Sequence, residues 1–127
     1  METKSLWGNL SELETIRTPK EILEEQALAL TSGTNGLLVG HVDARQNQPT
    51  FAYDLDVMVP LLNNYVYTIL SINHRITLYP VTVTSATSLL PSVQCENEEQ
   101  YTAAIERILS SKETKYILSR LLSQVTK

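Results

Sequence analysis

The sequence predicts a single α+β domain. A four-stranded antiparallel meander is expected to carry one N-terminal helix and two C-terminal helices packed on one face. Three observations lead to this fold class. Residues 36–85 hold four runs of β-branched and aromatic residues that alternate with a period of two. Asn, Pro and Arg separate these runs, as expected of turns. The flanking segments repeat apolar residues at helical spacing.

Residues 1–127 are expected to form one domain, of which residues 1–17 are an N-terminal arm. Apolar residues recur at positions 6, 7, 10 and 13 of this arm. A lone tryptophan in an apolar segment is most often a packing residue. We therefore expect the arm to lie against the domain with Trp7 as its anchor.

The first helix is expected to begin at Thr18. Threonine suits the N-cap, and Glu21, three residues later, completes a capping box. Apolar residues then follow one stripe, while the acidic residues of the segment face water. Gly33 is expected to end the helix in the left-handed conformation.

The first two strands are expected to pair around a turn centred on Asn47-Gln48. This register sets residue 44 opposite 51, 42 opposite 53 and 40 opposite 55. One face is then apolar. A slip by one residue would mix apolar and polar positions, so the hydrophobic pattern favours this register. The other face carries His41 opposite Asp54, with Asp56 close by.

The third strand is expected to follow a tight turn at Asn63-Asn64, since asparagine tolerates positive φ. The fourth run, residues 76–84, contains Pro80, which cannot donate a ladder hydrogen bond and so indicates an edge strand. Residues 85–94 are expected to be a crossing loop, with Leu89-Leu90 entering the core.

The C-terminal segment predicts two helices. Asn97 suits an N-cap with Gln100 at the third position, and Ser110-Ser111 interrupts the apolar stripe. The order helix, strands, helix resembles that of double-stranded RNA-binding domains in outline. Those domains need basic residues at the start of the last helix, where this chain reads Glu96-Asn97-Glu98-Glu99.

The second face of the predicted sheet becomes apolar along strands three and four. Residues 36–85 hold only five charged residues, which is few for a solvated face. We therefore expect a non-enzymatic, cytoplasmic interaction module that binds a second copy or another protein through this surface. Its predicted residues are Tyr65, Tyr67, Ile69, Ile76 and Leu78.

The net charge of −4 comes with no basic stripe, which disfavours nucleic acid and anionic membrane surfaces as partners. The start of the chain has no signal-peptide pattern. Cys95 is the only cysteine, so a reducing cytoplasm is expected. No motif indicates a catalytic residue, a cofactor or a small-molecule ligand.

Two alternatives remain open. His41, Asp54 and Asp56 could bind a metal ion or form a small hydrolytic site. An acidic chain of this size could also neutralise a basic protein, as inhibitor and immunity proteins do. The acids at positions 21, 24, 25, 54 and 56 would then contact the basic partner. His74 is expected in an exposed turn, and Cys95 is expected to be a partly buried structural thiol.

Overall fold

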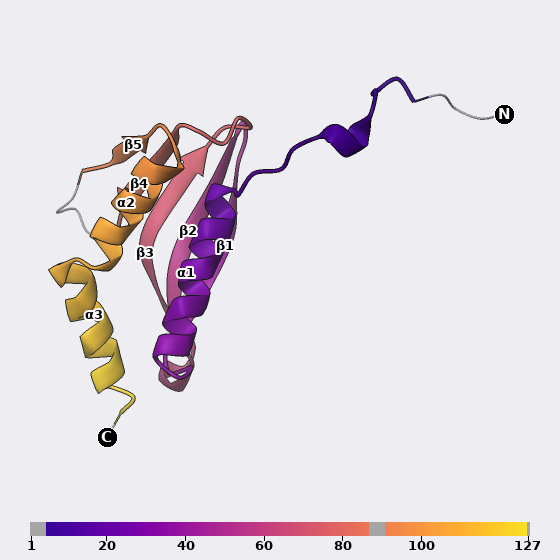
Figure 1. Ribbon diagram of the computed structural model, residues 1–127. Coiled ribbons are helices and arrows are strands. Elements are labelled where there is room, and N and C mark those ends of the chain that lie inside the picture. Colours follow the sequence, from indigo (N-terminus) through magenta and orange to yellow (C-terminus); the bar gives the residue numbers. More distant parts are fainter. Residues whose placement is uncertain (1–4, 87–90, 127) are drawn as a thin grey trace.

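The computed structural model describes residues 5–86 and 91–126, and no side chain of residues 46 and 47 (Figure 1). Its elements follow one another in the order expected for a helix, a meander and two further helices. In chain order they are η1 (Leu10–Glu12), α1 (Pro19–Gly33), β1 (Val39–Asn47), β2 (Thr50–Val59), η2 (Pro60–Leu62), β3 (Tyr65–His74), β4 (Val81–Ser85), β5 (Val93–Cys95), α2 (Glu98–Leu109) and α3 (Lys112–Ser123).

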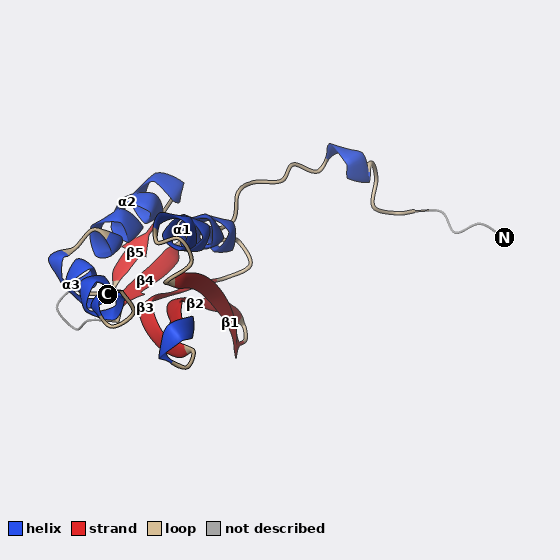
Figure 2. Ribbon diagram, turned by 90° about the horizontal axis from the view of Figure 1, so that it is seen from below, coloured by secondary structure: helices blue, strands red, loops and turns tan. Residues whose placement is uncertain are grey.

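The strands form one antiparallel sheet in the order β1-β2-β3-β4-β5. All three α-helices lie on the same side of it, and no described α-helix covers the other side (Figure 2). The predicted α+β class is confirmed, with a fifth strand, β5, inside the predicted crossing loop. β4 lies inside the sheet, between β3 and β5, so the edge placement was wrong. Pro80 precedes the strand and therefore removes no ladder hydrogen bond from it. Leu89 and Leu90 fall outside the described residues.

The register of β1 and β2 differs from the prediction by two residues. Gly40 lies opposite Val57 and Val42 opposite Leu55, because the strands continue to a turn of only two residues, 48 and 49. A shift of two keeps every side chain on its predicted face. His41 consequently lies opposite Asp56, and not opposite Asp54.

A β-bulge in β3 reverses the predicted faces of residues 65–68. Leu70 lies opposite Leu55 but Thr68 lies opposite Asp56, so Ile69 is the extra residue. Tyr67 therefore lies opposite Val57 and packs against the core. The alternation predicted for this strand was wrong from Ile69 towards its start.

The helices begin where their caps were predicted. The Glu21 amide donates to Thr18 Oγ1 at 3.1 Å, and the Thr18 amide donates to Glu21 Oε1 at 3.2 Å. The Gln100 amide donates to Asn97 Oδ1 at 2.9 Å. Gly33 is the last helical residue, and the left-handed positions that follow are Asn35 and Gly36. No described helix is long and apolar enough to cross a bilayer.

The contact between α1 and β1 is a backbone contact at Gly40. A Cβ atom at Gly40 would lie 2.5 Å from Ala27 Cα and closer still to Ala27 O. The Gly40 amide donates to Thr31 Oγ1 at 2.9 Å, which fixes the strand against the helix. On the far side of α1, the buried Tyr101 of α2 donates its hydroxyl to the Pro19 carbonyl at 2.9 Å.

Replacing Gly40 with alanine should therefore force α1 away from the sheet. We expect Gly40→Ala to lower the free energy of unfolding by about 2–3 kcal/mol or more, measured by urea denaturation. Gly33→Ala is the matched control, because a Cβ there meets nothing within 4 Å. It should change stability by no more than about 1 kcal/mol, on the stabilising side. Equal effects of the two substitutions would contradict the close approach.

Candidate interaction site

The structure does not gather the five predicted interface residues on one face. Ile69 is only 5% exposed and Tyr67 packs against the core, because of the bulge. Tyr65 is exposed at the start of β3. Ile76 and Leu78 lie in the connection between β3 and β4, where they line one cleft. The predicted surface is thus divided, and this pair is the part that remains together.

The cleft around this pair lies between the N-terminal end of α1, the start of β2 and the end of β3. Its volume is about 350 Å³. We call it the aromatic cleft, and its lining residues are Thr18, Lys20, Phe51, Tyr53, His74, Ile76 and Leu78. A second hollow of about 560 Å³ at the β1–β2 turn shares Phe51, Tyr53 and Ile76 with it.

Strand pairing builds the aromatic wall of this cleft. Phe51 of β2 lies opposite His74 of β3, and their rings stack with centroids 5.5 Å apart. The centroid of the Tyr53 ring, also from β2, lies 6.1 Å from that of His74. Lys20 Nζ is 5.8 Å from the centre of the Tyr53 ring, within reach of a cation–π contact. The wall therefore offers flat apolar surface beside one positive charge.

His74 is a wall residue and not the exposed turn residue that was predicted. It is the last residue of β3 and only 5% exposed. Its Nδ1 lies 2.7 Å from the Arg75 carbonyl oxygen, which can only accept, so Nδ1 carries the proton and donates. The sequence could have placed His74 on the core face, because it lies an even number of positions from Leu70 and Ile72 in the same strand. The three residues share the core face of β3.

Two large apolar side chains of the cleft remain open to water. Phe51 is 44% exposed, and Ile76 is 81% exposed. Scattered apolar residues are ordinary on a protein surface, but these two line the same hollow. A partner that covered them would remove apolar surface from water on both sides.

The N-terminal arm does not pack on the domain, so that prediction was wrong. Figures 1 and 2 show residues 5–16 extending away from the helices and the sheet. Trp7 is 80% exposed, and each of the other large apolar side chains of the arm is more than half exposed. These side chains are Leu6, Leu10, Leu13 and Ile16. At the root of the arm, Arg17 pairs with Glu25 of α1 and Glu98 of α2.

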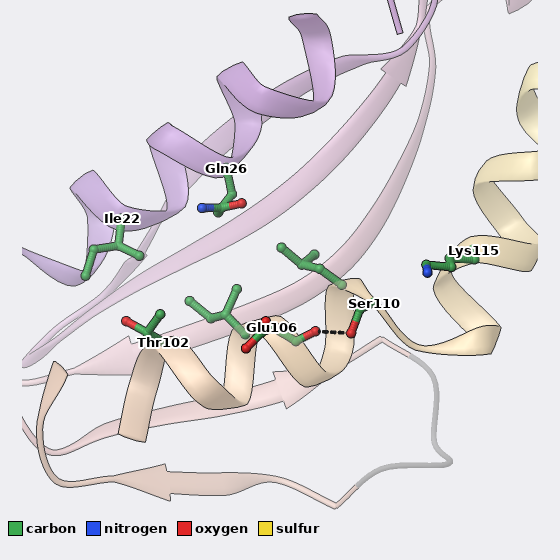
Figure 3. Close-up of a pocket in the computed structure, with 8 residues that line it drawn as sticks. Ile22, Gln26, Thr102, Glu106, Ser110 and Lys115 are labelled. Atoms are coloured by element: carbon green, nitrogen blue, oxygen red, sulfur yellow. Dashed lines mark hydrogen bonds between the residues drawn. The ribbon is translucent and has the colours of Figure 1, made fainter. Parts of the chain in front are cut away.

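A third hollow, which we call the helix groove, lies between α1, α2 and the start of α3 (Figure 3). Its volume is about 420 Å³. Ile22 and Ile105 form its floor and are already buried, whereas its walls carry polar groups. Its lining residues are Ile22, Gln26, Thr102, Ile105, Glu106, Leu109, Ser110 and Lys115.

The predicted metal site does not assemble. Among residues 5–86 and 91–126, no three His, Cys, Asp or Glu side chains lie close enough together to hold a metal ion. Asp54 accepts from Ser71 Oγ at 2.6 Å and pairs with Arg45 Nε at 3.0 Å. Asp56 is buried and accepts from Thr68 Oγ1 at 2.7 Å, while His41 is exposed. The two carboxylates are held by neighbours on the sheet.

The acidic residues considered for an inhibitor surface lie on opposite sides of the molecule. Glu21, Glu24 and Glu25 are exposed on α1. Asp54 and Asp56 share the face of the sheet that carries Arg45 and Thr68. One basic partner could not cover both groups in a single interface of ordinary size.

No protein-family model matches the chain, and comparisons with curated proteins and with solved structures find no significant match. The chain's own geometry defines a small α+β domain with an exposed apolar arm and an aromatic cleft at the root of that arm.

Cys95 is a structural thiol at the edge strand β5. It is fully buried, and this burial raises the pKa of the thiol, with a further contribution from the Glu96 carboxylate. Thiolate is the reactive form, so both the burial of the sulfur and its raised pKa oppose reaction. We expect the native protein to react with a thiol reagent such as DTNB only as fast as it unfolds. One equivalent of rapid reaction in native buffer would contradict this environment for Cys95.

Proposed function

We propose that this protein is a cytoplasmic protein–protein interaction module that self-associates, with residues 5–16 as the associating segment. One observation carries the proposal. Residues 5–16 present five large apolar side chains to water, and Arg17 at their root pairs with Glu25 and Glu98. Single apolar side chains are ordinary on a protein surface, but five of them within one short segment form an exposed apolar patch of the kind that other protein chains cover. A cytoplasmic location fits a single buried cysteine without a disulfide.

The energetics favour a dimer in which both arms are used. Fully burying one aliphatic or aromatic side chain contributes about 1.5–3 kcal/mol. Ordering a segment on binding costs about 2–5 kcal/mol, which five such side chains exceed. Two arms in one dimer also share a single loss of rigid-body freedom. Reciprocal binding is therefore more favourable than one arm bound alone, and closed two-fold dimers are the commonest oligomers.

The associating surface in this proposed dimer is the arm, and not the sheet face predicted from the sequence. The sheet surface first expected is interrupted by the bulge at Ile69, but Ile76 and Leu78 remain available beside the root of the arm. We do not propose the metal-binding alternative, because the described side chains offer it no group of three ligands.

Removing apolar side chains from the arm should abolish self-association without unfolding the domain. We expect the native chain to sediment at twice its 14.3 kDa mass at high concentration. A Leu10→Ser, Leu13→Ser variant should sediment as a monomer and melt at the temperature of the native chain diluted to its monomer, because neither side chain touches the core.

Leu28→Ser is the matched control for this experiment. Leu28 is as exposed as Leu13 but lies on α1, outside the arm. Its replacement should leave the dimer intact. A native chain that remains monomeric up to millimolar concentration would refute self-association, and a variant that still dimerises would exclude the arm as its cause.

A further inference from the structure

We propose that the aromatic cleft is the receptor for the arm, so that each copy of the chain places its arm in the cleft of the other copy. Trp7 and the neighbouring leucines would lie against Phe51, His74 and Ile76. This inference rests on the proposed self-association and adds the surface that receives the arm. Three properties of the cleft support it: its exposed apolar area, its charge and its position.

Large apolar side chains that are exposed to water distinguish the aromatic cleft from the helix groove. Phe51 and Ile76 of the cleft are largely open to water. Ile22 and Ile105 of the groove are already buried by the fold. The driving force for association is the apolar surface newly removed from water, and the exposed side chains of Phe51 and Ile76 supply such surface.

Charge favours the same choice. Residues 5–16 carry Glu12 and Glu14 and no basic residue. The lining of the aromatic cleft contains Lys20 and no acidic side chain, whereas the lining of the helix groove contains both Glu106 and Lys115. Lys20 makes a loose pair at 3.9 Å with the exposed Glu24 and lies over the Tyr53 ring, but its side chain stays 44% exposed, so its charge is accessible to a partner. An acidic arm therefore complements the cleft.

The position of the cleft explains why the occupant is a second copy. Thr18, at the root of the arm, itself lines the cleft, and Arg17 is held by Glu25 and Glu98. From this root the arm leads away from its own domain (Figure 1). Its own cleft could be reached only by reversing the chain within a few residues. Two copies around a two-fold axis can place each root beside the partner's cleft, and an extended arm spans up to about 40 Å.

The area involved is that of an ordinary stable interface. Burying Trp7 and four aliphatic side chains removes roughly 500 Å² of apolar surface per arm. Two arms and the surfaces beneath them then bury roughly 2,000 Å² in total, at the upper end of the standard range for specific interfaces.

Substitutions in the cleft test this inference separately from the proposed function. Ile76 is exposed and makes no core contact, so Ile76→Asp should keep the fold. It should raise the dimer dissociation constant at least about 100-fold, because both clefts of a dimer lose an apolar contact. Gln26→Asp in the helix groove should leave the constant nearly unchanged. A dimer that tolerates Ile76→Asp but not the arm substitutions would overturn the cleft as receptor and leave self-association intact.

Disulfide trapping identifies the receptor directly. A full-length Leu10→Cys chain is mixed with a full-length Ile76→Cys chain, or with a Thr102→Cys chain as the probe of the helix groove, and oxidised. We expect a covalent pair between different chains with Ile76→Cys and little with Thr102→Cys. Trapping at Thr102 in place of Ile76 would overturn the inference, as would trapping only when Leu10→Cys and Ile76→Cys are combined in one chain that remains monomeric.

Discussion

The backbone contact between Gly40 and Ala27 sets the position of α1, and the features at the arm's end of the molecule depend on that position. With no side chain between them, helix and strand approach closely enough for Thr31 to accept from the Gly40 amide. The Tyr101 hydroxyl ties the first turn of α1 to α2. The N-terminal end of α1 is therefore held beside the sheet, where Thr18 and Lys20 complete the aromatic cleft.

This arrangement places the exposed side chains of Phe51 and Ile76 beside the root of the arm. The pairing of β2 with β3 stacks Phe51 on His74, and the connection to β4 brings Ile76 into the same hollow. The arm leaves from the rim of that hollow. The opposite face of the sheet is different in kind, because its carboxylates at Asp54 and Asp56 are satisfied by hydroxyl groups and Arg45. The apolar end is therefore the surface best suited to association.

Local chemistry predicted much of the fold and little of the site. The side chains of Thr18 and Asn97 accept from backbone amides only three residues away, so the sequence alone places these caps. The bulge at Ile69 has no local signature, because it depends on how two strands fit together, and it divided the predicted interface. The apolar pattern predicted which face each residue of β1 occupies. It could not distinguish two pairings of β1 with β2 that differ by two residues, because both keep the same faces. The exposure of Trp7 could not be predicted either, since composition is the same for a packed and an unpacked arm.

The fluorescence of Trp7 tests the central claim most directly, because it is the only tryptophan in the chain and lies in the arm. If each arm lies in the aromatic cleft of the partner copy, concentrated protein should show short-wavelength tryptophan emission that is protected from quenching by acrylamide. Dilution should shift the emission to that of a solvent-exposed indole, with the same midpoint as dimer dissociation measured by sedimentation. Emission typical of an exposed indole at concentrations where the chain sediments as a dimer would contradict the account.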